Sequence, residues 1–81
     1  MKIKDGFKLQ NKDGKYIIPY ADGEQTAELT DTEKFLWDKL QEDITEKQLV
    51  SAMLLNYTID GATAETEVYD FINLLKDAGA I

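Results

Sequence analysis

Several residue types that many enzymes depend on are missing from this sequence. Its 81 residues include no histidine, no cysteine and no arginine, and only one proline. Without cysteine the chain has no disulfide and no thiolate metal site, which fits the reducing cytosol. Without histidine it lacks the commonest general acid–base group and a principal zinc ligand. We therefore expect a cytoplasmic protein that binds no metal and no other cofactor.

Long apolar runs are missing as well. No stretch approaches the roughly 18 apolar residues of a membrane span. The first eight residues contain three lysines and no apolar run, unlike a secretory signal peptide. The short length predicts one domain, residues 1–81, with a thin core and no contact with a membrane.

Carboxylates are abundant, but their pattern does not suggest catalysis. Glu65, Glu67 and Asp70 are expected on a solvated surface, whereas a catalytic carboxylate generally needs burial or a close partner. The sequence has no phosphate-binding glycine loop and no Ser/His/Asp set. The residues after Asp60-Gly61 do not continue as a calcium-binding loop. We expect a protein without enzymatic activity.

Charge is distributed unevenly along the chain. Residues 1–16 carry five lysines and two aspartates, a net charge of +3, whereas residues 17–81 carry four lysines and fourteen acids, a net charge of −10. Such an acidic surface repels phosphate backbones and would favour a basic partner segment. It is equally suited to keeping a small protein soluble. The sequence therefore argues against a nucleic-acid partner and leaves the role of the acidity open.

Three short strands are predicted in the first third of the chain. Residues 7–10 alternate apolar and polar, and residues 16–18 are aromatic and β-branched. Residues 24–29 form a third, short strand pattern. Asp13-Gly14 and Asp22-Gly23 lie between these segments and supply the positive φ angles of tight turns.

Three amphipathic helices are predicted to follow. Thr30 with Glu33 and Thr45 with Gln48 have the spacing of capping boxes, and Gly79 suits a helix C-terminus. The first helix should end near residue 41 and the second near residue 57. Trp37 is expected at the flank of the first helix. The residues expected to face the core are Phe35, Leu36, Leu40, Leu49, Val50, Met53, Leu54, Tyr57, Ala64, Val68, Phe71, Leu75 and Ala78.

The economical arrangement of these elements is an α+β domain, in which a three-stranded antiparallel sheet packs against three helices. The third strand would then lie at the sheet edge and could accept an added strand from a peptide. Glu24 and Glu28 could instead simply protect that edge. Tyr69 and Ile72 lie beside the core stripe of the last helix, and either widen the core or form one wall of a shallow groove.

Four segments resemble the PqqD family. Residues 29–37 (LTDTEKFLW) are similar to the L-N-x-T-(G/A)-x-x-(I/L)-W opening of its first helix. Residues 45–50 (TEKQLV) resemble the T-x-x-(E/Q)-(I/L)-V of its second helix, and residues 71–79 (FINLLKDAG) its closing F-L-x-x-L-x-x-x-G helix. Residues 16–19 (YIIP) resemble a family strand. The likeness covers nearly the whole chain in order and spacing.

The resemblance implies a winged helix-turn-helix-like domain that recognises the leader segment of a ribosomally made, post-translationally modified peptide (a RiPP). Such a domain presents the precursor to a modifying enzyme, often a radical enzyme that uses an iron–sulfur cluster and S-adenosylmethionine. It also implies that the leader adds as a strand to the third strand and lies against the third helix. By position, the implied peptide-binding residues are Glu24, Gln25, Thr26, Ala27, Glu28, Leu29, Glu65, Tyr69, Ile72, Asn73 and Lys76.

The sequence departs from the family pattern at two places. Glu33 stands where glycine or alanine is common, and an early glutamate suits a helix N-terminus. The segment from residue 19 to residue 29 is shorter than in many members, which affects the extent of the third strand and the register of a bound leader.

Two other functions remain as alternatives. A winged-helix DNA-binding domain shares the architecture, but its recognition helix would carry basic side chains, and here only Lys47 lies on the second helix. An adaptor between folded proteins would differ from a leader-binding protein only in its partner.

Overall fold

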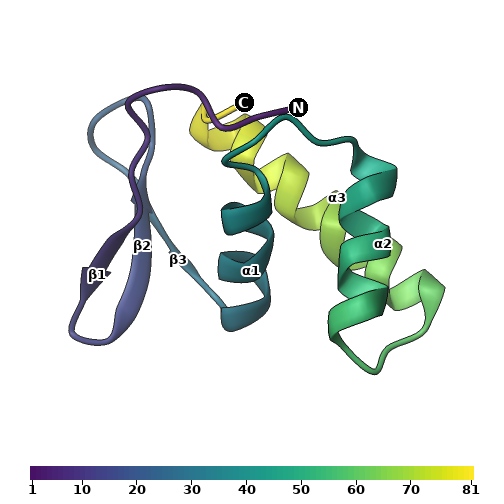
Figure 1. The fold of residues 1–81 in the computed structure, drawn as a ribbon. Coiled ribbons are helices and arrows are strands. Elements are labelled where there is room, and N and C mark those ends of the chain that lie inside the picture. The colour runs from purple at the N-terminus through teal and green to yellow at the C-terminus, as the bar shows by residue number, and fades with distance from the viewer.

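The computed structural model describes all residues, 1–81, as a three-stranded antiparallel sheet followed by three helices (Figure 1). The α+β architecture is therefore the predicted one. The sheet has the order β1-β2-β3. Its elements are β1 (Gln10–Lys12), β2 (Lys15–Pro19), β3 (Thr26–Leu29), α1 (Asp31–Lys39), α2 (Glu46–Asn56) and α3 (Gly61–Ala78).

The first hairpin shows how a turn fixes the register of a sheet. Asp13 and Gly14 both have positive φ, 55° and 79°, so they form the predicted two-residue turn. This turn makes Lys12 the partner of Lys15, and the ladder continues to Gln10 opposite Ile17. The predicted first strand, residues 7–10, is therefore wrong in position.

The side chains of residues 7–9 nevertheless alternate between partly buried and exposed, as the sequence pattern indicated. Phe7 and Leu9 are partly buried against the core although they lie outside a strand. Two residues further along the hairpin ladder, the partner of Lys8 would be Pro19, which has no N–H to donate.

The third strand is shorter than predicted, because the Asp22 carboxylate holds the backbone that precedes it. Its Oδ1 accepts hydrogen bonds from the amides of Glu24 and Gln25, at 2.8 and 3.0 Å. Those two residues are therefore part of the turn, and β3 begins only at Thr26.

All three helices begin at side-chain caps. Thr30 and Thr45 accept from the amides of Glu33 and Gln48, whose side chains accept in return from the cap amides, which confirms both predicted capping boxes. Asp60 caps α3 by accepting from the Thr63 amide at 2.7 Å. α1 and α2 each end one or two residues earlier than expected.

The core is one cluster of 15 buried residues, and no buried residue is polar or charged. α3 contributes more of them than any other element: Ala64, Val68, Phe71, Ile72, Leu75 and Ala78. The sheet contributes Ile18 and Leu29. No helix is long and apolar enough to cross a membrane.

Two expectations about which residues form the core need correction. Trp37, expected at a flank, is only 3% exposed and belongs to the core cluster. Leu54, expected to face the core, is 42% exposed. On α2 the buried side chains are Leu49 and Met53, and Leu54 lies about 100° further around the helix than Met53.

The C-terminal end of α3 is joined to two distant parts of the chain. The Ala78 carbonyl accepts from the amide of Ala21 at 2.7 Å, and the Ala80 carbonyl accepts from the amide of Lys4 at 2.8 Å. Gly79 lies between them with a φ of +79°, and a Cβ placed on it would lie 2.8 Å from the Cβ of Ala21. The loop between β2 and β3 therefore packs directly on the end of α3.

This close approach gives a prediction for Gly79→Ala. The substitution would impose a left-handed backbone on alanine, at roughly 1–2 kcal/mol, and would also force the loop at Ala21 away. We expect it to lower the free energy of unfolding by about 1 kcal/mol more than Gly23→Ala. Urea denaturation of both variants measures the difference.

Gly23→Ala is a matched control, because Gly23 has a φ of +78° and no atom within 4 Å of the added Cβ. Gly23→Ala therefore measures the free-energy cost of the left-handed backbone alone, without a steric clash. Equal losses in the two variants would show that the packing of the loop on α3 contributes nothing.

Candidate functional site

The first component of the site is the free edge of β3. The strand order leaves β1 and β3 at the two edges of the sheet. Glu28 on β3 forms an exposed ion pair with Lys15 at 3.7 Å, which contributes little to stability. Lys15 belongs to the neighbouring strand β2, so this ion pair does not cover the outer edge of β3, and the main chain there is open to an added strand.

The register of the sheet determines which groups point outward from this edge. Pro19 pairs with Thr26, and since proline has no N–H, this is a non-hydrogen-bonded pair. Antiparallel pairs alternate, so Ala27 and Leu29 direct their N–H and C=O groups toward β2. The amide and carbonyl groups of Thr26 and Glu28 therefore face the open edge.

The side chains of β3 alternate in the complementary way. Leu29 is buried and Ala27 is half-buried against the core, whereas Thr26 and Glu28 are exposed. Of the six predicted peptide-binding residues of this segment, these four lie in the strand. The other two, Glu24 and Gln25, lie in the preceding turn, where the Gln25 side chain donates to Asp22 Oδ2 at 2.8 Å.

The predicted residues of α3 lie on one flank of that helix but differ in exposure. Tyr69 is 60% exposed and Ile72 only 5%. Ile72 therefore widens the core and is not an exposed anchor. Glu65 and Lys76 are exposed and Asn73 is half-buried. Their contact with a peptide stays a prediction.

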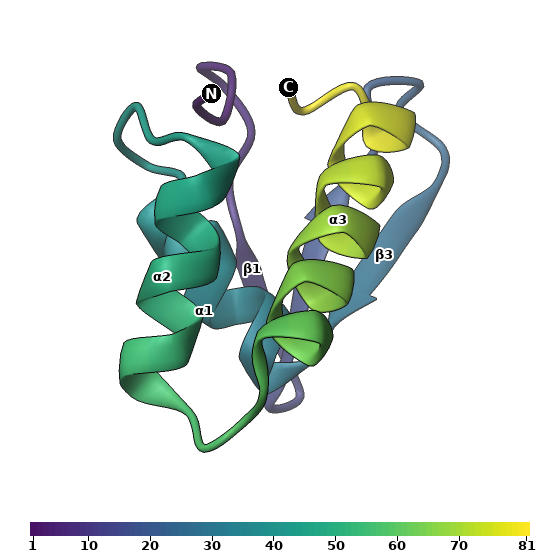
Figure 2. The same cartoon turned by 90° about the vertical axis from the view of Figure 1, so that its right-hand side faces the viewer.

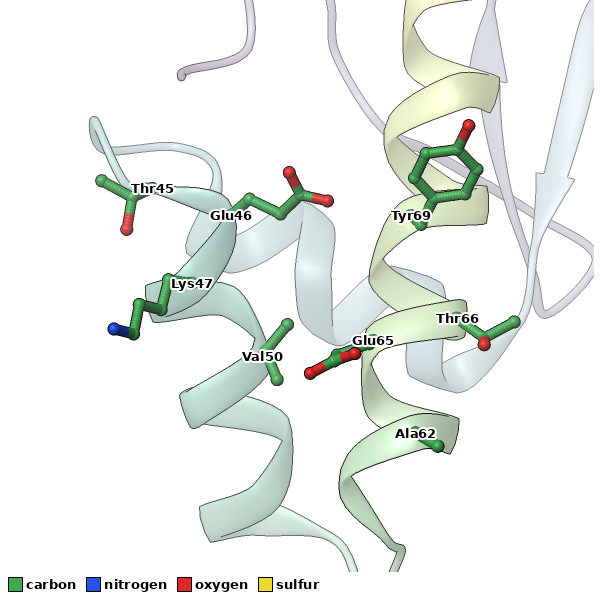
Figure 3. A pocket seen from close by; sticks show the side chains of 8 residues that line it. All are labelled: Thr45, Glu46, Lys47, Val50, Ala62, Glu65, Thr66 and Tyr69. Atoms are coloured by element: carbon green, nitrogen blue, oxygen red, sulfur yellow. The ribbon is translucent and has the colours of Figure 1, made fainter.

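The flank that carries Glu65 and Tyr69 faces α2. Both residues line a hollow of about 910 Å³ between α2 and α3, together with Thr45, Glu46, Lys47, Val50, Ala62 and Thr66 (Figure 3). Two smaller hollows lie by the α1–α2 connection and by the N-terminal segment. None of the three includes a residue of β3, so the edge of β3 is an open rim and not a pocket.

The opposite flank of α3 carries residues that the sequence analysis did not select. Figure 2 shows α3 between α2 and β3. Because Glu65 and Tyr69 face α2, the flank on the other side of the core stripe faces β3. Glu67 and Asp70 on that flank are exposed, and Leu74 is partly buried against the core. The only feature of the sequence that could have pointed to this flank is Leu74, an apolar residue next to Leu75 but outside the core stripe.

Three aspartates of the molecule have a lowered pKa, and in each case the cause is a local hydrogen bond or the N-terminal charge. Backbone hydrogen bonds from Gln25 and Glu24 lower the pKa of Asp22, and side-chain and backbone hydrogen bonds from Thr63 lower the pKa of Asp60. The N-terminal ammonium lowers the pKa of Asp43. Each of these shifts accompanies a turn, a helix cap or a chain end. The site thus offers main-chain donors and acceptors to an extended chain.

Comparisons with known proteins agree with this geometry. A structure described as TbiB1 in complex with the TbiA(beta) leader peptide superposes with a TM-score of 0.80 at 23% identity, covering 99% of this chain and 93% of that one. A second, lasso peptide synthetase B1 complexed with the leader peptide, gives a TM-score of 0.75 at 16% identity, covering 96% and 92%. At these identities the likeness concerns the fold. The comparison with curated proteins gives no match.

The family comparison is more specific, because the model of the family described as coenzyme PQQ synthesis protein D (PqqD) matches residues 14–81. The matched region begins at the hairpin turn and includes β2, β3 and all three helices. It therefore contains the open edge of β3 and both flanks of α3. The chain belongs to the PqqD family.

Proposed function

We propose that residues 1–81 form a single leader-peptide-binding domain that acts without catalysis in the cytoplasm. The observation that carries this proposal is the open edge of β3, where Thr26 and Glu28 present their main-chain groups beside α3. Membership of the PqqD family supports it. The two structural neighbours, both solved with leader peptides, support it further.

The proposed mechanism is addition of the leader as a fourth strand. Main-chain hydrogen bonds to Thr26 and Glu28 would hold the leader in register, and its alternate side chains would contact the molecule on either side. The domain would then present the precursor to a modifying enzyme, such as a radical S-adenosylmethionine enzyme. Tethering the leader raises the effective concentration of the segment to be modified.

The contribution of α3 follows from its position beside β3. We propose that a leader on β3 contacts the flank with Glu67, Asp70 and Leu74, because that flank faces the strand (Figure 2). Leu74 is the apolar anchor available there. Tyr69, which the family resemblance implies as a peptide-binding residue, lies on the other flank. Whether the leader contacts Tyr69 therefore tests the resemblance at that position.

DNA binding gains no support from the structure. The second helix, α2, is the helix that was expected to act as the recognition helix, and it carries one cation, Lys47, beside the acidic Glu46. Phosphate binding needs clusters of lysine or arginine, which this helix does not have.

Glu28→Pro should weaken leader binding. It removes an outward-facing amide while leaving the ladder between β2 and β3 intact, and proline is tolerated at such an edge position. We expect a loss of affinity of roughly three- to tenfold, the effect of one main-chain hydrogen bond. The measurement is an NMR titration of the isotope-labelled protein with the leader segment of a RiPP precursor peptide that the parent protein binds.

Glu28→Ala is the matched control, because it removes the ion pair with Lys15 but keeps the amide. It should bind the leader nearly as well as the parent protein. Ala27→Pro, in contrast, should destabilise the sheet, since the Ala27 amide faces β2. If Glu28→Pro and Glu28→Ala bind the leader equally, strand addition at this edge is wrong.

A second prediction assigns the flank of α3 that meets the leader. We expect Leu74→Ala to lower leader affinity at least about fivefold, which corresponds to about 1 kcal/mol, while Tyr69→Ala leaves it nearly unchanged. Tyr69 is 60% exposed, so its replacement should not disturb folding. Isothermal titration calorimetry with the same leader measures both. A large loss for Tyr69→Ala alone would place the leader on the α2-facing flank.

A further inference from the structure

A second surface of the molecule lies on the side of α3 that faces away from β3. It is the hollow between α2 and α3, which we call the α2–α3 groove. Two of the four large apolar side chains that are exposed in this protein lie by this groove: Tyr69, at 60%, in its lining, and Leu54, at 42%, one helical turn from the lining residue Val50. Single exposed apolar residues are ordinary, but their concentration on two adjacent helices indicates an interaction surface.

Three of the eight residues that line the α2–α3 groove are apolar. Val50 and Ala62 line it from the two helices, and the exposed ring of Tyr69 stands at its rim (Figure 3). Leu54 follows Val50 by one helical turn and extends the apolar surface along α2. A partner side chain could therefore bury apolar area there without any movement of the backbone.

The rim of the groove is acidic. The carboxylates of Glu46 and Glu65 point into the space between the helices, whereas the side chain of Lys47 points away from it (Figure 3). Neither Glu46 nor Glu65 forms an ion pair within the molecule. Residues 46–78 as a whole carry six carboxylates and two lysines. The one cation in the lining, Lys47, points away from the space between the helices, so the groove complements a basic ligand.

We propose that the α2–α3 groove docks a basic amphipathic helix of the modifying enzyme, with apolar side chains on Val50 and Tyr69 and lysine or arginine beside Glu46 and Glu65. This inference rests on the proposed leader-binding function. α3 then separates two binding events, with the leader on the β3 side and the enzyme on the α2 side. Because the two surfaces do not overlap, leader and enzyme bind simultaneously.

The test uses a defined probe, a synthetic amphipathic helix of leucine and lysine, titrated into the isotope-labelled protein and followed by NMR. We expect shifts at Val50, Leu54, Glu65 and Tyr69, weakened by added salt. The same peptide with glutamate in place of lysine should not bind. Absence of shifts with the lysine peptide, or shifts confined to β3, would overturn the proposal.

A pair of variants on the same helix separates specific docking from general attraction to an acidic protein. Glu65→Lys should lower probe affinity roughly tenfold, whereas Asp77→Lys, with the same change in charge, should alter it less than about threefold. Tyr69→Ser should weaken binding, and Leu55→Ser, outside the lining of the groove, should not. Equal effects of the two lysine variants would contradict a specific site.

The outcomes also distinguish the occupant and the underlying function. If the groove residues shift with protein concentration alone and sedimentation shows a dimer, the groove pairs two copies of this chain and the enzyme is not its occupant. Glu46→Lys, at a groove residue outside the predicted peptide-binding set, should leave leader affinity unchanged. Loss of leader binding with the groove intact would overturn the proposed function, and loss of probe binding with the leader site intact would overturn only this inference.

Discussion

The backbone contacts at the C-terminal end of α3 are the constraint on which the arrangement of the molecule depends. The hydrogen bond from Ala21 to the Ala78 carbonyl joins the loop between β2 and β3 to the helix, and the bond from Lys4 to the Ala80 carbonyl joins the N-terminal segment to the same place. Gly79 permits this approach, because no side chain stands between helix and loop. The sheet is thereby held beside α3 at a fixed distance.

As a result, α3 lies between two separate surfaces of the molecule. Its core stripe packs inward, so both of its flanks remain accessible, one toward β3 and one toward α2 (Figures 1 and 2). The two flanks differ in chemistry. The β3 side offers open main-chain groups, which suit an extended peptide, and the α2 side offers apolar side chains with an acidic rim, which suit a folded, basic partner.

Local chemistry made much of this fold predictable. The caps at Thr30 and Thr45 and the turn at Asp13-Gly14 depend on residues within a few positions of one another, and all were predicted. The start of β3 was not predicted, because it depends on the Asp22 carboxylate binding two amides beyond the turn.

The misplaced parts of the prediction depend on tertiary neighbours. Helical periodicity identifies an apolar face, but it does not say which element covers each flank of that face. Leu54 was therefore expected in the core and Trp37 outside it. The same limit applies to the flank with Tyr69, which lines the hollow between α2 and α3 and whose contact with a leader stays a prediction. In the family comparison the same ambiguity remains, since position along a helix does not by itself identify the neighbouring element.

The pairing of Pro19 with Thr26 sets a limit on how tightly a peptide can bind through its main chain. Only Thr26 and Glu28 face the open edge, so β3 can form about four hydrogen bonds with an added strand. At roughly 0.5–1.5 kcal/mol each, these bonds supply about 2–6 kcal/mol, less than the about 8 kcal/mol of micromolar affinity. The side chains of a ligand must provide the rest. A chain with the right backbone but the wrong side chains would therefore leave the strand quickly, and discrimination between ligands would reside in the rate of dissociation.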